Sequence, residues 1–370
     1  MTEGTTRRGF LARALRGACA LCAGGAALAA DSGEASGLVR ANYWRTLGDD
    51  VHCQLCPRGC TVAQNERGFC GARENRGGVY YTMVYGKVAA RRIDPIEKDP
   101  LFHFKPGIKT FAIATAGCNM DCKFCQSWEM ALSRPEDVPY VKMSPKEVVA
   151  EAIKRGCRAI CYTYTEPVNF IEYAIDVAKE AHKHKLLNVC HTAGYINPEP
   201  LADLCEYMDA FNFDLKGHTE KFYAEVCRAR LAPVLRAIKQ AKQSGRWVEI
   251  TTLVIPTLND SEQAIRAIAR WIRLTLGANT PFHLTRFFPQ YQLKKLPATP
   301  IQKLVDLRKV AFGEGLNYVY VGNVPGHPGE STYCPKCSAR VVWRVNYEVR
   351  QVALRAGRCP VCGMKIPGIW

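Results

Sequence analysis

The sequence lacks the features of several large protein classes. Only one long apolar run occurs in its 370 residues, at the extreme N-terminus, which excludes a protein that crosses a membrane many times. Hydrophobic residues make up 48% and charged residues 23%, an ordinary composition that excludes a mainly disordered, collagen-like or coiled-coil chain. The length is about two to three times that of a typical domain, so we expect two or three folded units.

Long blocks of like charge are also absent, although the net charge is +16, from 50 Lys and Arg against 34 Asp and Glu. A basic excess of this size can indicate a nucleic-acid partner. The basic residues are, however, spread along expected helices, and metal-bound thiolates would cancel part of the excess. We therefore expect a solvated basic surface and no nucleic-acid partner.

What the sequence has in unusual number is cysteine, with 18 residues. Eleven of them form three clusters: Cys53, Cys56, Cys60 and Cys70; Cys118, Cys122 and Cys125; Cys334, Cys337, Cys359 and Cys362. The chain is too long for a small disulfide-stabilised scaffold, and gaps of two and three residues suit a metal better than a disulfide framework. The clusters therefore predict metal or iron–sulfur sites.

Residues 1–30 have the pattern of a targeting signal. Arg7 and Arg8 precede Gly-Phe-Leu, and a run of small residues follows over 17–30, with an Ala-Leu-Ala site at 27–29. This pattern resembles a twin-arginine export signal, which carries folded proteins and predicts a periplasmic protein with no transmembrane domain in its mature chain. The alternative is a flexible Arg-rich tail on a cytoplasmic protein. Cys19 and Cys22 lie in this segment and are not candidate metal ligands.

From about residue 110 to 321 short β-branched runs alternate with amphipathic helices. Ser144 and Glu147 form a capping box that opens one helix, and Gly156 closes it. The expected strands are 110–115, 158–164, 187–191, 211–215, 248–254, 282–287 and 318–321. The alternation predicts an α/β fold of parallel βαβ units, with a full or partial (β/α) barrel favoured over an open sheet. In either architecture the chemistry lies at the carboxyl ends of the strands.

Three cysteines follow the first expected strand directly, with the spacing C-x3-C-x2-C. Thiolates of Cys118, Cys122 and Cys125 can hold three irons of a four-iron cluster and leave the fourth iron open. A zinc site or a ferredoxin would normally bring a fourth cysteine nearby, and none occurs before Cys157. The spacing therefore predicts a [4Fe-4S] cluster with an open coordination position.

The two flanking cysteine sets differ in what they predict. Cys334, Cys337, Cys359 and Cys362 form two C-x2-C pairs around an alternating segment at 341–352, the pattern of a zinc ribbon. For Cys53, Cys56, Cys60 and Cys70, zinc, an auxiliary cluster and disulfides all remain open. The other cysteines lie on apolar faces, where core packing is expected: Cys157, Cys161, Cys190, Cys205 and Cys227. We expect an N-terminal cysteine-rich segment at 31–105, a core barrel at 106–328 and a ribbon module at 329–370.

The motif Cys-x3-Cys-x-Phe-Cys, with Phe124 at the aromatic position, resembles the signature of the radical S-adenosylmethionine (SAM) superfamily. The chain is most similar to enzymes like pyruvate formate-lyase activating enzyme, and within them to the radical SAM member of the AmmeMemoRadiSam system. This narrower resemblance covers nearly all of residues 50–370. It rests on the motifs at 53–57, 94–104, 117–119, 322–326 and 366–370.

The resemblance implies a mechanism. An iron-bound SAM is cleaved by one electron to methionine and a 5′-deoxyadenosyl radical, which abstracts a hydrogen atom from a substrate. The substrate is a backbone glycine of a partner enzyme or a small molecule, and the electron donor is of the flavodoxin or ferredoxin type by analogy. The alternative is a zinc-ribbon adaptor that binds protein or nucleic acid and has a catalytically silent barrel.

The resemblance also places cofactor-binding residues at the ends of later strands. Glu166 matches the acid of a Gly-Gly-Glu-Pro motif, and its alternative role is a helix N-terminal acid. The segment 191–194, His-Thr-Ala-Gly, replaces an Asp-Thr-Asn-Gly motif, so His191 stands where the family has a carboxylate. Asp214 and Lys216 match an Asp-Leu-Lys motif, with a plain salt bridge as the alternative, and His283 is a further candidate. The predicted cofactor-binding residues are Phe124, Glu166, Thr192, Asp214, Lys216 and Arg286.

Overall fold

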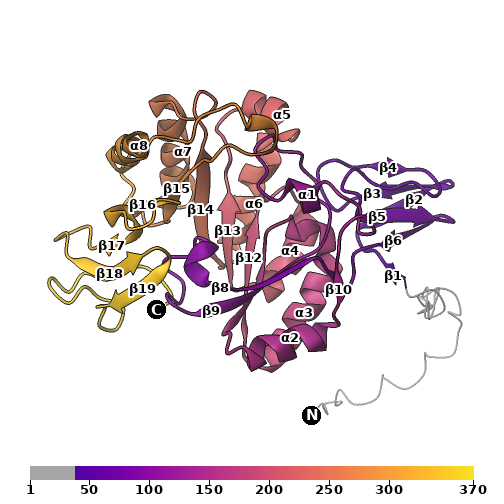
Figure 1. Ribbon diagram of the computed structural model, residues 1–370, viewed down its shortest axis with the longest axis horizontal. Coiled ribbons are helices and arrows are strands. Elements are labelled where there is room, and N and C mark those ends of the chain that lie inside the picture. The colour runs from indigo at the N-terminus through magenta and orange to yellow at the C-terminus, as the bar shows by residue number, and fades with distance from the viewer. Residues whose placement is uncertain (1–37) are drawn as a thin grey trace, which may run out of the picture. The chain divides into compact units, whose positions relative to one another are not determined.

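An eight-stranded sheet organises the middle of the chain (Figure 1). Its strand order is β16-β15-β14-β13-β12-β11-β9-β8, and all neighbours are parallel except β8 (Ala90–Pro95), which runs antiparallel to β9. The parallel strands are β9 (Lys109–Ala114), β11 (Ala159–Tyr162), β12 (Leu187–Thr192), β13 (Ala210–Asp214), β14 (Trp247–Val254), β15 (Phe282–Arg286) and β16 (Val319–Gly322). Within the described residues no pairing joins β16 to β8, so the barrel is partial.

The computed structural model describes residues 38–370. The expected signal segment at 1–30, with Cys19 and Cys22, lies outside these residues. Among residues 38–370 no helix is both long and apolar enough to cross a bilayer.

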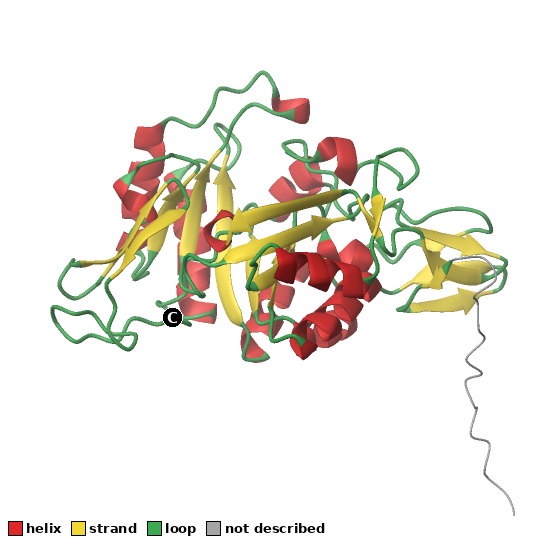
Figure 2. Ribbon diagram, turned by 60° about the horizontal axis from the view of Figure 1, so that its bottom comes forward, coloured by secondary structure: helices red, strands yellow, loops and turns green. Residues whose placement is uncertain are grey.

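Helices connect the parallel strands, as the alternating sequence pattern predicts (Figure 2). They are α1 (Trp128–Ala131), α2 (Pro145–Lys154), α3 (Ile171–Lys183), α4 (Pro198–Tyr207), α5 (Glu220–Cys227), α6 (Leu231–Gln243), α7 (Glu262–Thr275) and α8 (Ile301–Gly313). Ser144 and Glu147 form the predicted capping box at the start of α2. Short 3-10 turns lie at η1 (Ile96–Lys98), η2 (Pro167–Phe170), η3 (Tyr291–Leu293) and η4 (Pro328–Glu330).

The central strands have continuous apolar sequences because both of their faces are buried. All four residues of β11 are buried, as expected for a parallel strand covered on both faces. Every predicted strand is present, with bounds that differ by one or two residues, and the predicted fold class is confirmed. Sequence reasoning missed β8, which lies inside the expected N-terminal segment and extends the barrel sheet by pairing with β9.

The N-terminal cysteine-rich segment contains two small antiparallel sheets. One has the order β1-β6-β5 and the other β2-β3-β4. The strands are β1 (Val39–Arg40), β2 (Trp44–Leu47), β3 (Asp50–Cys53), β4 (Thr61–Val62), β5 (Arg73–Arg76) and β6 (Val79–Thr82). A further two-stranded pair joins β7 (Lys87–Val88) to β10 (Val141–Lys142).

The C-terminal module is a three-stranded antiparallel sheet, β17 (Thr332–Tyr333), β18 (Arg340–Val345) and β19 (Glu348–Val352). It contains the hairpin predicted at 341–352 and packs on the barrel through Phe102, Tyr318 and Tyr320. A bridge between Phe104 and Ile369 and a hydrogen bond from Lys105 N to Ile369 O hold the chain end against the segment before β9.

Candidate active site at the carboxyl ends of the barrel strands

A pocket of about 320 Å³ lies where the parallel strands end. Its lining includes the whole cysteine triad and most of the residues predicted to bind the cofactor: Cys118, Cys122, Cys125, Phe124, Glu166, Thr192, Asp214 and Lys216. These side chains come from the loop after β9 and from the ends of β11, β12 and β13. The structure therefore brings together residues that are up to 98 positions apart, Cys118 and Lys216 among them.

The loop that carries the triad is tightly built against its neighbours. Gly117 has φ +94°, and a Cβ there would lie 2.6 Å from the Cys70 carbonyl oxygen, so only glycine fits. Asn119 donates from Nδ2 to the Tyr195 carbonyl at 2.7 Å, and its own carbonyl accepts from Arg58 Nε at 2.6 Å. These bonds fix the loop from both sides.

The chemistry of the triad fits a metal cluster. Burial raises the pKa of Cys125 to about 11 and the pKa of Cys118 well above the ordinary thiol value, so a bound cation is needed to hold these groups as thiolates. Within residues 38–370, the only group of three or more candidate ligand atoms within 4.8 Å of one another is in the C-terminal module. The triad does not form such a single-ion group, and a cluster, in which each thiolate binds a separate iron, fits three thiols on one loop.

Glu166 lies at the end of the second parallel strand with its carboxylate buried. Its Oε1 accepts from Thr192 Oγ1 at 2.5 Å, and its Oε2 accepts from Ala193 N at 2.9 Å. Oε1 also accepts from Val168 N at 3.3 Å, which caps the short turn η2. Burial raises the pKa of Glu166 against the effect of these donors. The two roles considered for this residue, pocket carboxylate and cap, are thus compatible in one side chain.

A row of alternating charges crosses the pocket floor. His191 Nε2 lies 3.1 Å from Asp214 Oδ1 and its Nδ1 lies 3.8 Å from Asp99 Oδ1, while Lys216 Nζ lies 2.8 Å from Asp214 Oδ2. Burial opposes a charged imidazole, but Asp214 and then Asp99 outweigh it and raise the pKa of His191 to about 10. The salt bridge proposed for Asp214 and Lys216 is present, and both residues also line the pocket.

The segment 94–104 supports this floor from below. The buried Glu249 carboxylate accepts from Phe102 N at 3.0 Å, from His103 N at 2.8 Å and from His283 Nε2 at 2.7 Å. The segment then delivers Lys98 and Asp99 to the pocket. His283, a candidate from its strand, is a partner of this buried network and does not line the pocket.

Arg286 is placed differently from the other predicted cofactor-binding residues. Its Nε donates to the Thr299 carbonyl at 2.8 Å and its guanidinium lies over the Phe288 ring, outside the residues that line the pocket. The side chain lies beside the loop before α8, so its role in binding the cofactor stays a prediction.

Several pocket residues were missed by sequence reasoning. They include Asp99, Thr251, Thr285, Asn323 and Tyr347. Asp99 and Asn323 lie inside the motifs at 94–104 and 322–326, so a signal for them was available. Tyr347 carries none, because it comes from the C-terminal hairpin and reaches the pocket only through the packing of that module. Its hydroxyl donates to Asn323 Oδ1 at 2.6 Å.

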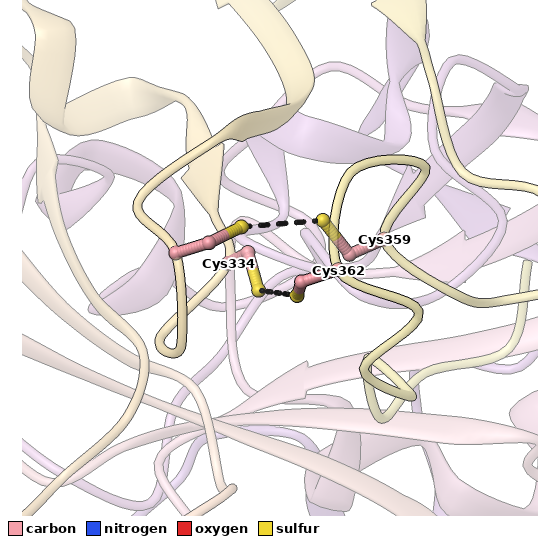
Figure 3. A group of neighbouring side chains, drawn as sticks. Cys334, Cys359 and Cys362 are labelled. Carbon is pink, nitrogen blue, oxygen red and sulfur yellow. Dashed lines mark hydrogen bonds between the residues drawn. The ribbon is translucent and has the colours of Figure 1, made fainter.

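The four C-terminal cysteines point toward one another (Figure 3). Their sulfur atoms all lie within 4.8 Å, with 3.5 Å between Cys334 and Cys362 and 3.6 Å between Cys337 and Cys359. This spacing is close to the roughly 4 Å expected between sulfurs bound tetrahedrally to one zinc ion. The predicted metal-binding group of the ribbon is therefore present, and it lies apart from the pocket.

Comparisons with known proteins agree with this geometry. An uncharacterized protein of Methanocaldococcus jannaschii is 45% identical over 329 residues, which cover 88% of this chain and 98% of that protein. The benzylsuccinate synthase activating enzyme of Thauera aromatica is 24% identical over 50% of this chain and 61% of its own length. The isethionate sulfite-lyase activating enzyme of Oleidesulfovibrio alaskensis is 26% identical over 40% of this chain and 47% of its own length.

A family model described as the radical SAM superfamily matches residues 112–271. This range begins in β9, contains the triad loop and ends in α7, so it includes most of the pocket. Members of the family hold a [4Fe-4S] cluster and SAM, which is the ligand set that the spacing and burial of the three thiols fit. By its match, its motif and its fold, the chain belongs to the radical SAM superfamily.

Proposed function

We propose that this protein is an enzyme that cleaves SAM reductively and abstracts a hydrogen atom from a substrate. The observation that carries the proposal is the opening of Cys118, Cys122 and Cys125 into one pocket with Glu166 and Lys216. When bound, the cluster supplies one electron to SAM, which yields methionine and a 5′-deoxyadenosyl radical. The residues of the chain bind SAM, orient it and exclude water from the pocket.

The polar side chains of the pocket suit the two ends of the SAM amino acid. The Glu166 carboxylate keeps one free acceptor position for the SAM ammonium. Lys216 has three N–H donors and spends one on Asp214, so two remain for the SAM carboxylate. Phe124 lies 5.6 Å from the Lys216 ammonium and provides an apolar wall beside it.

We propose a protein substrate, as in the relatives that are named activating enzymes, with a low-potential electron donor of the flavodoxin or ferredoxin type. The motifs shared with the radical SAM member of the AmmeMemoRadiSam system support membership of that system. A zinc-ribbon adaptor with a silent barrel is the competing function.

The direct test is anaerobic reconstitution with iron and sulfide, followed by SAM and a strong reductant and detection of 5′-deoxyadenosine. We expect product from the parent and none from Cys122→Ala. Cys205→Ser, which replaces a buried cysteine on α4 outside the pocket, is the matched control and should keep the product. A fully loaded cluster that gives no product would favour the adaptor.

We further propose that the ribbon cysteines bind zinc and that the zinc is structural. A structural site contributes folding free energy directly, so Cys359→Ser should lose zinc and melt at a lower temperature while the triad keeps its iron. Val361→Ala, at a side chain that is 72% exposed in the same turn, is the control. A Cys359→Ser protein that keeps its zinc and its melting temperature would refute the assignment.

The last proposal concerns location. The twin-arginine pattern at residues 7 and 8 supports export of the folded, cofactor-loaded protein to the periplasm. Replacing Arg7 and Arg8 with Lys should then retain the protein in the cytoplasm, whereas Arg13→Lys should not. Unchanged fractionation of the double variant would exclude this route.

A further inference from the structure

The N-terminal cysteine cluster forms a compact set at the edge of the N-terminal sheets. Cys53 ends β3, Cys56 and Cys60 lie in the loop to β4, and Cys70 precedes β5. All four are free thiols, and the sulfurs of Cys53, Cys56 and Cys70 lie within electrostatic reach of one another and of Cys60. This group is called here the N-terminal set. Its four neighbouring thiols are enough ligands for one metal centre.

The spacing of the sulfurs separates the two kinds of metal centre. The ribbon cysteines meet within 4.8 Å, as one zinc ion requires, and among the described residues they alone do so. Neither the N-terminal set nor the triad forms such a single-ion group in residues 38–370, and for the triad the family implies a cluster. Each thiolate of a four-iron cluster binds a different iron, so its sulfurs lie farther apart than those of a zinc site.

Hydrogen-bond donors are already arranged around these sulfurs. The backbone N–H groups of Leu55, Arg58 and Ala72 lie near the thiols of Cys53, Cys56 and Cys70 respectively, and they oppose the rise in thiol pKa that burial causes. Each donor lies two residues after its cysteine, a turn that presents the N–H to the sulfur. N–H groups in such positions stabilise thiolates and tune iron–sulfur centres.

Two fully buried side chains beside the N-terminal set carry donors without a well-formed partner in the described part of the chain. They are the Tyr80 hydroxyl and Arg73 Nε, both on residues with 0% exposure. A Cβ on Gly68 would lie 2.8 Å from the Tyr80 hydroxyl and 3.9 Å from Cys60 Sγ, so the hydroxyl and this sulfur share one small space. An unsatisfied buried donor costs about 1–3 kcal/mol, and sulfide and thiolate sulfurs would satisfy both.

The N-terminal set touches the triad loop directly. The Cys70 carbonyl oxygen packs on Gly117, the residue before Cys118. Arg58, which lies between Cys56 and Cys60, donates to the Asn119 carbonyl at 2.6 Å and to the Arg228 carbonyl at 2.5 Å. Two metal centres held by these loops would be neighbours.

Two largely buried cysteines of the N-terminal set lie in the wall of a cleft. A cleft of about 660 Å³ is lined by Cys53, Cys56 and Pro57, together with Arg230 and Arg236. This cleft and the pocket of the triad share no lining residue. An external reductant can therefore approach the N-terminal set without entering the SAM pocket.

We propose that Cys53, Cys56, Cys60 and Cys70 hold a second [4Fe-4S] cluster, which passes electrons from a low-potential one-electron donor to the cluster of the triad. The site stands on its own geometry, while the relay rests on the function proposed above. One electron enters the second cluster from the donor and one leaves it for the first, so the centre returns to its starting state in every turnover.

The decisive protein is the full chain with Cys118, Cys122 and Cys125 all replaced by Ala. After anaerobic reconstitution with iron and sulfide, this variant should keep about four irons per chain, half of the parent's roughly eight, and show a reduced-cluster EPR signal that SAM does not change. It should also keep about one zinc, in the ribbon. A triad variant with no iron, or with two zinc ions per chain, would overturn the second cluster.

The converse variant, Cys56→Ser with Cys60→Ser, should keep about four irons and an EPR signal that responds to SAM. Its zinc content reports whether the chain has folded, and Cys205→Ser is the matched control. If this variant fails to fold, the triad variant alone still decides the site, because it leaves the N-terminal set intact.

The relay is tested on the same proteins. Reduced parent protein should show magnetic interaction between two clusters, and the triad variant should not. The converse variant should make 5′-deoxyadenosine when dithionite is the reductant. With a flavodoxin-type donor, it should make this product at least about tenfold more slowly than the parent does with the same donor. Equal rates with that donor would overturn the relay. Absence of product in every loaded protein would instead overturn the proposed function and leave the second cluster standing.

Discussion

The Glu166 carboxylate has about four acceptor positions on its two oxygens, and protein donors occupy three of them. Thr192 Oγ1, Ala193 N and Val168 N are these donors, at 2.5, 2.9 and 3.3 Å. Because Glu166 lines the pocket of the triad, the remaining position is the one left for a ligand bound there. A carboxylate saturated to this degree cannot rotate toward another partner, so it is preorganised for one cation.

Glu166→Gln should therefore weaken SAM binding without loss of the cluster. The amide removes a charge-assisted hydrogen bond worth roughly 1.5–3 kcal/mol, which corresponds to roughly 10- to 150-fold lower affinity. Titration of SAM against the EPR signal of the reduced cluster measures the change, and Glu151→Gln on exposed helix α2 is the control. Unchanged affinity would mean that Glu166 serves only as a cap of η2.

His191 fills the place where the resemblance expected a carboxylate and brings the opposite charge. Its imidazole lies between Asp214 and Asp99, and only 23% of the side chain is exposed. Lys216 holds the other oxygen of Asp214, so four groups of alternating sign neutralise one another. A bound cation is unnecessary at a position where a protonated imidazole already balances the acids.

The raised pKa of His191 predicts how stability depends on pH. A group whose folded pKa is about 10, above the ordinary 6.5, contributes stability that is complete below the unfolded value and is lost as pH rises through about 10. The difference in unfolding free energy between the parent and His191→Gln should therefore shrink by at least about 1 kcal/mol from about pH 6 to about pH 10.5. Denaturant unfolding at both pH values measures it. A difference that is constant or grows with pH would contradict a charged His191.

At the scale of elements, the hairpin β18–β19 connects the ribbon to the pocket. Val345 pairs with Glu348, so Asn346 and Tyr347 form a two-residue turn, and both have positive φ, 53° and 67°. A left-handed conformation costs a tyrosine more than it costs asparagine or glycine. The strained residue is the one whose side chain lines the pocket and bonds Asn323.

Tyr347→Ala should raise abortive SAM cleavage more than about twofold, because removal of the ring opens the pocket to water and reductant. The measurement is 5′-deoxyadenosine formed without substrate, at equal iron and zinc content. Trp343→Ala changes a ring that is 38% exposed on the same hairpin and does not line the pocket, so it should leave abortive cleavage unchanged. Equal rates in the two variants would assign Tyr347 to the hairpin alone.

Local patterns account for the elements that could be predicted. The capping box of Ser144 and Glu147 fixes the start of α2 through contacts three residues apart, and alternation of helices and apolar runs gives the parallel strands. β8 was missed because four of its six residues are exposed or charged and its assignment depends on pairing with β9. Tyr347 was missed for the same kind of reason, since its contact with Asn323 follows from the docking of a separate module.

At the scale of the whole molecule, the triad could be predicted because three ligands lie within eight residues of sequence. The charged row at the pocket floor could be predicted only in part. Asp214 and Lys216 are two residues apart in the sequence. Asp99 reaches the same row through its contact with His191, and it lies on the segment 94–104, whose His103 N–H donates to the Glu249 carboxylate. Such long-range supports leave no periodic signal, although they decide which strand ends converge on the triad.

Arg344 is the residue that joins the ribbon to this support. It is buried, its Nη2 donates to the Phe102 carbonyl at 2.5 Å, its Nη1 donates to Thr332 Oγ1 at 2.8 Å, and its Nε lies 3.4 Å from the Glu97 carboxylate. Burial raises the pKa of Glu97, and the arginine charge opposes that rise. The ribbon, the segment 94–104 and the barrel therefore meet at one buried ion pair.

Arg344→Met should destabilise the protein by about 3–5 kcal/mol, because it leaves the Glu97 carboxylate buried without its partner. The double variant with Glu97→Gln should recover part of this loss, since the amide carries no charge and can still accept from Gly107 N. Zinc release and loss of helical circular dichroism, followed together during denaturant unfolding, should coincide in the parent, whereas zinc should leave first in Arg344→Met. If the two signals still coincide in that variant and its stability matches that of the parent, the ion pair does not couple the ribbon to the barrel. The contacts of Phe104 with Ile369 and of His103 with Pro367 must then provide the coupling.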